Sequence, residues 1–182
     1  MHVLTIRPIQ PDDLDAVLRV QAACYPPAMQ EAAGVVLDRM RIAGATCVVA
    51  EDEGGVCGYL FAYPSRMGKA TPLGAGFFPA PDADTLYLHD LALAPRANGR
   101  GLARRLVNHL LDQARQTGMA WLALVSVQDT AGFWGALGYR PAEVRDPQAR
   151  AALATYPGSA RYMVKPLTAP GAPWPSCSSL RP

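Results

Sequence analysis

The amino-acid sequence predicts a mixed α/β domain in which helices pack on a twisted sheet. Short β-rich runs alternate along the chain with segments whose apolar residues recur at helical spacing. The segment with the strongest helical periodicity, residues 101–118, separates two β-rich runs. The chain of 182 residues is 50% apolar and 18% charged, which is typical of one globular domain. We expect this domain to occupy residues 1–167 and the Pro- and Ser-rich residues 168–182 to be disordered.

The N-terminal elements are predicted from hydrophobic periodicity and from residues that break it. Residues 3–9 form a short β-rich run. Residues 11–25 carry apolar side chains at helical spacing, with Asp12 or Asp13 as the candidate N-cap. Two consecutive prolines end that helix. A second, weaker helix is predicted over residues 29–44.

A β-hairpin and a long loop are predicted next. Residues 46–52 and 56–64 are β-rich, and Gly54 and Gly55 supply the tight turn between them. Residues 64–84 are rich in Pro and Gly and show no period. A loop of that length inside a compact domain is usually functional or mobile.

The C-terminal half continues the alternation of strands and helices. A strand over residues 85–95 precedes the long helix at 101–118, which Gly118 closes. The later predicted elements are an apolar strand at 119–127, a short helix at 129–139 and two strands at 141–145 and 160–167.

Charge and cysteine content argue against several classes of protein. The formal net charge of +2, without a basic block, does not favour binding to nucleic acid. The four cysteines contain no C-x-x-C pair, so we expect reduced core residues and no metal site. The sequence shows no apolar signal core and no run near the roughly 18 apolar residues of a membrane span. We therefore predict a cytoplasmic protein that does not contact a membrane.

The stretch "RANGRGLA" is the first candidate binding feature. Pro95 ends the preceding strand, and the helix that follows begins with backbone N–H groups that lack internal partners. Gly99 and Gly101 let the backbone curl and remove Cβ atoms that would block a ligand. Such a turn can hold phosphate oxygens, with Arg96 and Arg100 as additional contacts. The alternative is a flexible turn, and no G-K-[ST] follows to make a P-loop.

Three motifs in register resemble the GNAT superfamily of acetyltransferases. "RANGRG" at 96–101 is similar to its pyrophosphate-binding signature, [QR]-x-x-G-x-[GA]. "LALAP" at 91–95 resembles its fourth strand, and "FWGALGY" at 133–139 resembles its last helix. The order of elements fits from about residue 3 to residue 167. The resemblance implies a twisted, splayed mixed sheet with helices on both faces.

The resemblance also implies that acetyl-CoA is the co-substrate. In this family the turn before the helix holds the pyrophosphate through backbone N–H groups, and the pantetheine pairs with the fourth strand. Side chains at the next strand-to-helix junction contact the pantetheine arm. Carried onto this sequence, the binding residues are Leu91, Ala92, Leu93, Arg96, Ala97, Asn98, Gly99, Arg100, Gly101, Leu102, Ala103, Gln128 and Trp134.

His89 is the candidate general base. A lysine-like amine has a pKa of about 10.4, so it must lose a proton before it attacks a thioester. Strand alternation predicts that Tyr87, His89 and Leu91 share one face, with Leu88 and Asp90 on the other. "LHDLALAP" is similar to the strand of arylalkylamine N-acetyltransferases, whose histidines serve water-mediated deprotonation. His89 matches one of those histidines and Tyr87 replaces the other. A structural histidine is the alternative.

The resemblance leaves the general acid open. A backbone N–H near Leu91 is the family-like donor to the oxyanion. The family's usual tyrosine on the last helix aligns with Trp134, and an indole N–H is no useful acid. Either Tyr139 or a water molecule protonates the sulfur, or the thiolate leaves unaided, since a thiol with a pKa of about 8.5 is a fair leaving group. We expect Trp134 to pack against the pantetheine arm.

Three further residues are weaker candidates for contact with the acceptor. Glu31 lies on the second predicted helix, where it could attract a cationic amine or simply face solvent. Tyr87 and Ser126 lie on strands near the expected thioester. Asp90 is expected to face away from the thioester and to brace a turn.

The sequence therefore predicts an N-acetyltransferase that acts on a small primary amine, as a monomer or homodimer. A protein or peptide acetyltransferase is one alternative, although the long loop at 64–84 favours a closed pocket over an open groove. A CoA-binding module without catalysis is the other.

Overall fold

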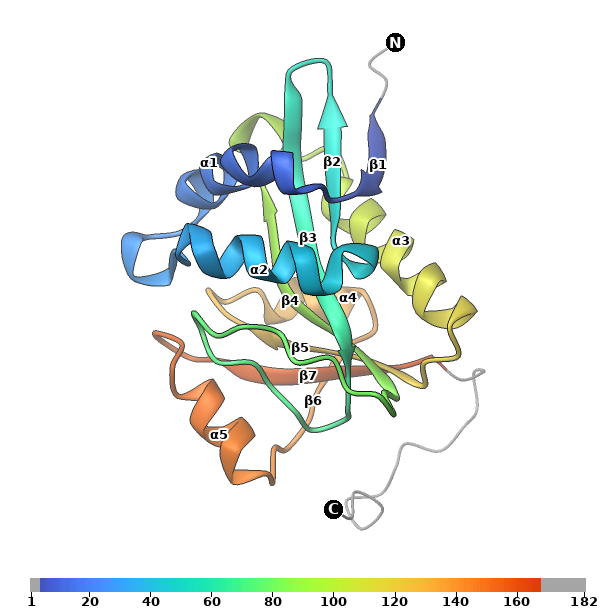
Figure 1. Cartoon of the computed structure of the whole chain (residues 1–182). Helices are drawn as coiled ribbons and strands as arrows, with labels where there is room; N and C mark the ends of the chain where they lie inside the picture. Colours follow the sequence, from blue (N-terminus) through green and yellow to red (C-terminus); the bar gives the residue numbers. More distant parts are fainter. Residues whose placement is uncertain (1–3, 168–182) are drawn as a thin grey trace.

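The computed structural model describes residues 4–167 as one mixed sheet with helices on both faces (Figure 1). This arrangement confirms the predicted fold class, and the predicted tail at 168–182 lies outside the described residues. The strands are β1 (Thr5–Pro8), β2 (Val48–Asp52), β3 (Gly55–Ser65), β4 (Thr85–Leu93), β5 (Trp121–Ser126), β6 (Arg140–Pro141) and β7 (Arg161–Pro166). The α-helices are α1 (Leu14–Cys24), α2 (Ala33–Ala43), α3 (Leu102–Gln116), α4 (Ala131–Ala136) and α5 (Pro147–Leu153).

The sheet contains one parallel contact, between β4 and β5. The strand order is β1-β2-β3-β4-β5-β7-β6, and the other neighbouring pairs are antiparallel. Residues 85–88 of β4 pair with residues 121–124 of β5. Beyond Leu88 the described pairing of β4 is with β3 alone, so β4 and β5 separate there. The splay that the resemblance implied is present at this point.

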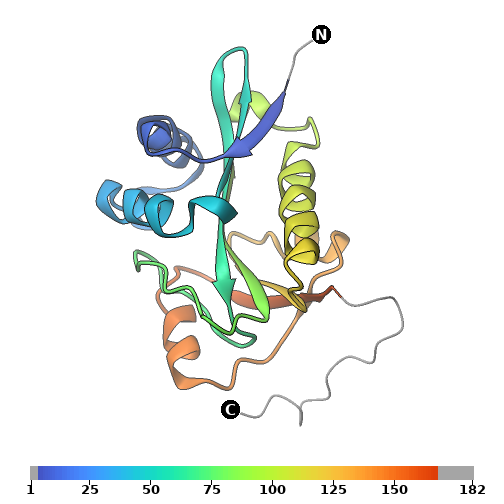
Figure 2. The same cartoon turned by 45° about the vertical axis from the view of Figure 1, so that its right-hand side comes forward.

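Two hydrophobic cores lie on opposite faces of the sheet. Helices α1, α2 and α5 pack on one face, and α3 and α4 pack on the other (Figure 2). The apolar stripe predicted for α3 is buried as expected, through Leu102, Leu106, Leu110 and Ala114. None of the helices within residues 4–167 is long and apolar enough to cross a bilayer.

Strand β4 carries a β-bulge where it leaves β5. Residues 61 and 62 of β3 pair with Asp90 and Leu88, so His89 is the extra residue. Because of the bulge, His89 and Asp90 both face the side of the sheet covered by α1 and α2. Leu91 instead packs against the core beneath α3. The predicted alternation, with Asp90 opposite to His89 and Leu91 beside it, is therefore wrong.

The structure also corrects two predicted elements. Helix α2 begins at Ala33, so Glu31 lies in the segment before the helix and not on it. In place of the strand predicted at 141–145 the chain forms only the two-residue strand β6, and α5 was not predicted. A signal for α5 was present, because Asp146 caps Gln148 at 3.0 Å and Pro147 occupies the first helical position.

The long loop between β3 and β4, residues 66–84, is fastened along its length. Four of its backbone N–H groups donate hydrogen bonds to side-chain oxygens from other elements. The acceptors are Tyr162 for Gly68, Tyr87 for Thr71, Thr155 for Leu73 and Glu31 for Gly74. The Tyr156 hydroxyl donates to the Thr71 carbonyl at 2.7 Å. These bonds connect the loop to β4, β7, the end of α5 and the segment before α2.

Candidate active site

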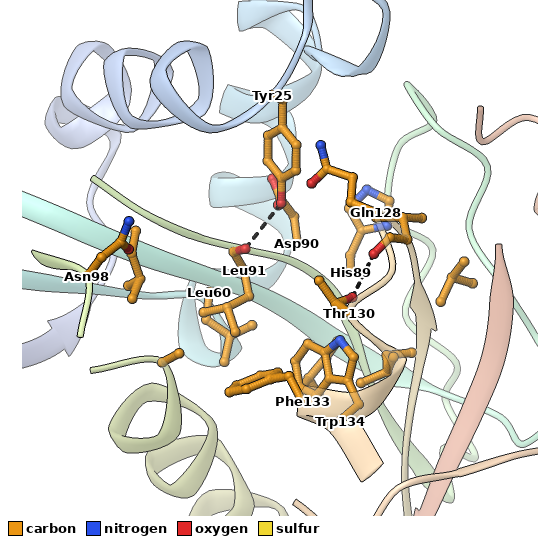
Figure 3. A pocket seen from close by; sticks show the side chains of 16 residues that line it. Tyr25, Leu60, His89, Asp90, Leu91, Asn98, Gln128, Thr130, Phe133 and Trp134 are labelled. Carbon is orange, nitrogen blue, oxygen red and sulfur yellow. Dashed lines mark hydrogen bonds between the residues drawn. The ribbon is translucent and has the colours of Figure 1, made fainter. Parts of the chain in front are cut away.

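A cavity of about 250 Å³ opens where β4 and β5 separate (Figure 3). Its walls come from β4, β5, the start of α3 and helix α4. The lining residues are Tyr25, Leu60, Leu88, His89, Asp90, Leu91, Leu93, Asn98, Ala103, Leu124, Val125, Val127, Gln128, Thr130, Phe133 and Trp134. The bulge on β4 is the feature that places His89 and Asp90 at this opening.

The start of α3 forms an open turn beside the cavity. Gly99 and Gly101 have φ values of +74° and +68°, a conformation that side chains with a Cβ rarely adopt. An added Cβ at either glycine would meet no protein atom within 4 Å. Asn98 and Ala103, which flank these glycines, line the cavity. A phosphate group fits this open helix N-terminus, and the cavity continues from it toward His89.

Arg96 does not extend toward the open turn. Its guanidinium donates to both oxygens of Asp52, at 2.5 and 2.6 Å, and to carbonyls of the β2–β3 turn. Arg100 approaches the same carboxylate at 3.4 Å. The Arg96 contacts hold the pKa of Asp52 below its usual value. The Arg96 side chain was predicted to contact a phosphate. In the structure it instead fastens the β2–β3 hairpin to the turn before α3.

Valine at position 101 is expected to weaken acetyl-CoA binding by about tenfold or more. A Cβ at this φ strains the turn, and hydrogen bonds to a charged group contribute about 1.5–3 kcal/mol each. Gly118→Val is the matched control, because Gly118 has φ +74° at the other end of the same helix. We expect both variants to lose stability and only Gly101→Val to lose affinity in titration calorimetry. Equal affinities would contradict this use of the turn.

His89 belongs to a buried charged cluster. The His89 side chain is 2% exposed, and its Nε2 lies 3.2 Å from Oε1 of Glu31. Both Glu31 oxygens accept hydrogen bonds from Arg39, whose side chain is 1% exposed. Burial opposes ionisation of Glu31, but hydrogen bonds from His89 and Arg39 outweigh it and hold the pKa of Glu31 well below its usual range. Glu31 is thus neither a solvated residue nor a free attractor for a cation.

The Glu31 carboxylate sets the tautomer of His89. An ionised carboxylate only accepts hydrogen bonds, so Nε2 of a neutral His89 carries the proton and Nδ1 carries the lone pair. Nδ1 is buried and has no hydrogen-bond partner within residues 4–167. An orphaned polar atom of this kind is unusual in a folded protein, and a catalytic role is one explanation for it.

Asp90 is a carboxylate without a cationic partner in the described part of the chain. Its two oxygens accept hydrogen bonds from the hydroxyls of Tyr25 at 2.6 Å and Tyr59 at 2.7 Å. Burial raises the pKa of Asp90, and the two phenols oppose that rise. The hydroxyl of Tyr25 also lies 3.1 Å from the carbonyl of Leu91 (Figure 3).

Trp134 lines the cavity, and Tyr139 lies behind it. The two rings meet edge to face, with centroids 5.3 Å apart. Tyr139 does not line the cavity, its hydroxyl is buried without a partner among the described residues, and burial raises its pKa far above the usual value. The geometry therefore gives no support to Tyr139 as the general acid.

Phenylalanine at position 139 is expected to leave turnover unchanged and to stabilise the protein by about 1 kcal/mol. The change removes a buried hydroxyl that has no partner, and such groups cost about 1–3 kcal/mol. Tyr162→Phe provides the comparison, because that hydroxyl accepts a hydrogen bond from Gly68 at 2.9 Å and its loss should destabilise. Urea unfolding and steady-state rates measure both effects, and a large drop in kcat for Tyr139→Phe would restore its acid role.

The other predicted residues divide into two groups. Leu91, Leu93, Asn98, Ala103, Gln128 and Trp134 line the cavity. Ala92, Ala97 and Leu102 are core residues whose side chains do not reach it. Tyr87 is buried and supports the loop, and Ser126 is buried with its hydroxyl 3.1 Å from that of Thr130. Neither Tyr87 nor Ser126 lines the cavity.

Sequence reasoning missed Arg39 and two residues that follow Gln128 at the junction after β5, Thr130 and Phe133. Arg39 shares a helical face with Val36, Met40 and Ala43, and a charge on that apolar stripe was a readable sign of a buried ion pair. Thr130 and Phe133 line the cavity next to Gln128. Gln128 itself has φ +52°, a strained conformation that tends to occur at functional sites and that no sequence signal announces.

This combination of a splayed sheet, an open helix N-terminus and a cavity between them defines the class of protein. The family model of the acetyltransferase (GNAT) family matches residues 14–139. The chain therefore belongs to the GNAT family of acetyltransferases.

Individual relatives are distant. The chain is 24% identical over 132 residues to L-2,4-diaminobutyric acid acetyltransferase of Halomonas elongata, an alignment that covers 72% of this chain and 62% of the relative. The chain thus spans less than two thirds of that relative's length.

Two solved structures illustrate the shared fold. The GphF GNAT-like decarboxylase in complex with isobutyryl-CoA superposes with a TM-score of 0.74 and 19% identity, covering 90% of this chain and 100% of that one. The ribosomal-protein-S18-alanine N-acetyltransferase of Escherichia coli superposes with a TM-score of 0.66 and 19% identity, covering 93% and 97%. At this identity the likeness shows the fold.

Proposed function

We propose that the protein is an acetyl-CoA-dependent N-acetyltransferase whose acceptor is a small primary amine. The observation that carries the proposal is the cavity between β4 and β5. It runs from the open turn at Gly99 and Gly101 to the bulge at His89. Both reactants would then meet at the point where the two strands separate.

The chain's own residues suit acetyl-CoA at this site. The backbone N–H groups of residues 96–101 would hold the pyrophosphate, and the main chain of residues 91–93 would pair with the pantetheine. A backbone N–H near Leu91 would face the thioester oxygen. Trp134 and Gln128 line the cavity wall opposite that strand and would contact the pantetheine arm.

His89 would receive the proton of the acceptor ammonium at Nδ1, with water assistance. That atom is buried, so side chains around the cavity would shift when the acceptor binds. The amine nitrogen then bonds to the acetyl carbon, and the carbon–sulfur bond breaks. One proton from the amine is released, and another ends on the sulfur. A thiol with a pKa of about 8.5 is a fair leaving group, so a water molecule suffices in place of the family's tyrosine.

Several observations favour a small acceptor over a polypeptide. The loop at residues 66–84 is fastened over the site, and its Leu73 reaches the acceptor side. The relative from Halomonas elongata is named for a small diamine acid, whereas the Escherichia coli enzyme is named for an alanine of ribosomal protein S18. The similarity of β4 to arylalkylamine N-acetyltransferases makes an aromatic amine one choice within this class. A cytoplasmic location and a monomer or homodimer remain part of the proposal.

The test measures thiol release from acetyl-CoA over a panel of small amines and N-terminal peptides. Turnover of free amines supports the proposal, and acetylation of peptides alone would move the protein to the polypeptide class. Tight acetyl-CoA binding without any turnover would identify a CoA-binding module instead.

A further inference from the structure

A second, smaller cavity adjoins the first on the acceptor side. It measures about 30 Å³ and shares Tyr25, His89, Asp90, Val125 and Val127 with the larger cavity. Its remaining walls are Met29, Glu31, Leu73 and Tyr156. Since the proposed thioester site occupies the larger cavity, an acceptor in the smaller one would present its amine beside His89 and Asp90. The small volume favours a compact acceptor.

The described residues that line the smaller cavity include two carboxylates and no lysine or arginine side chain. No lysine or arginine is among the residues that line either cavity in the described chain. Arg39 is the nearby cation, but its donors are committed to Glu31 and to the carbonyl of Ala75. Glu31 is therefore already neutralised. Asp90 is left as a carboxylate held only by two phenol hydroxyls.

The polar groups beside Asp90 are also committed. Tyr25 donates to Asp90 and lies 3.1 Å from the carbonyl of Leu91, and Tyr156 donates to the carbonyl of Thr71. What remains for a ligand is one ionisable carboxylate, the unpartnered Nδ1 of His89 and the apolar side chains of Met29, Leu73 and the two valines. A cation can be bound here, whereas an anion would lie against Asp90 with no lysine or arginine among the described lining residues to balance it.

We infer that the acceptor is a compact primary amine that carries no carboxylate next to its amine, with its ammonium group held by Asp90. This inference rests on the proposed N-acetyltransferase function and narrows its substrate class. L-2,4-Diaminobutyric acid bears a carboxylate. The inferred acceptor therefore differs from the compound for which the Halomonas elongata relative is named. An amino acid would place its carboxylate within reach of Asp90 in a desolvated space, where like charges are strongly disfavoured.

Matched pairs of amines test the inference with the full chain. 1,3-Diaminopropane, tyramine and histamine are the decarboxylated forms of L-2,4-diaminobutyrate, L-tyrosine and L-histidine. In thiol-release assays with acetyl-CoA, we expect kcat/KM to favour the decarboxylated member of any pair that turns over by about 100-fold or more. Equal or better turnover of the amino acid overturns the inference while leaving the acetyltransferase function intact. No turnover of these or of a wider amine panel overturns the function itself.

Two variants test the role of Asp90. Asp90→Asn is expected to raise the KM of the best amine by about tenfold or more and to reduce its advantage over the paired amino acid, without changing acetyl-CoA affinity. Asp84→Asn is the matched control, since Asp84 precedes the same strand and lines neither cavity. Leu73→Lys leaves Asp90 untouched and adds a cation to the smaller cavity, so it should shift preference toward the amino acid. Preferences that stay unchanged in both variants would contradict the inference.

Discussion

Alanine at position 89 is expected to lower kcat by about 100- to 10,000-fold while acetyl-CoA binds as it does to the native protein. The structure gives His89 a fixed tautomer through Glu31 and leaves Nδ1 without a partner in the described residues. Removing the imidazole removes the proposed proton acceptor. The open turn that would hold the pyrophosphate is unaffected, because it lies at the other end of the cavity.

Steady-state kinetics over a pH range and titration calorimetry measure the two quantities separately. His109→Ala is the control, since His109 is exposed on α3 and away from the cavity. Added imidazole should restore part of the rate to His89→Ala, a response that a purely structural histidine would not give. If kcat stays at the native level, His89 is structural and the proton must leave through another group.

The sequence was sufficient for the fold and for the open turn, because both rest on local signals. Periodicity located α3 with its buried stripe, and two glycines after Pro95 marked the start of that helix. The predicted hairpin of β2 and β3 is also present. Each of these features depends on residues close together in the sequence.

The site was less predictable because its geometry depends on long-range pairing. The bulge that moves Asp90 to the face of His89 arises from the register between β3 and β4, which strand alternation cannot reveal. The position of the Arg96 side chain depends on Asp52, a residue of β2 that is distant in the sequence. Glu31 could not be placed either, because its partners Arg39 and His89 come together only in the fold.

Methionine at position 39 is expected to destabilise the protein by about 3–5 kcal/mol at neutral pH. Methionine keeps much of the aliphatic volume of arginine, but Glu31 then lies buried without its guanidinium partner. The substitution also removes the donors to the carbonyl of Ala75, which tether the loop, and the guanidinium that lies 4.8 Å from the ring of Phe77. Urea unfolding followed by circular dichroism measures the change.

Two further variants separate the ion pair from simple repacking. Arg41→Met removes an exposed arginine of the same helix, 3.7 Å from Asp38, and should change stability by no more than about 0.5 kcal/mol. Adding Glu31→Gln to Arg39→Met removes the orphaned charge but keeps an oxygen for the N–H of Gly74. The double variant should therefore be more stable than Arg39→Met alone, and a lower stability would contradict the ion-pair explanation.

The pH dependence of these variants follows from the pKa of Glu31. In the native protein that pKa lies well below its usual range, so the stabilisation is complete above the unfolded value of about 4.3 and is lost only as the pH falls through the folded pKa. Without Arg39 the burial of Glu31 remains while its guanidinium partner is gone, and we expect its folded pKa to rise above the unfolded value. A group shifted in that direction loses stability as the pH increases. Arg39→Met should therefore be less destabilised at pH 5 than at pH 8, whereas an effect that stayed constant with pH would indicate that lost packing and not the buried charge is responsible.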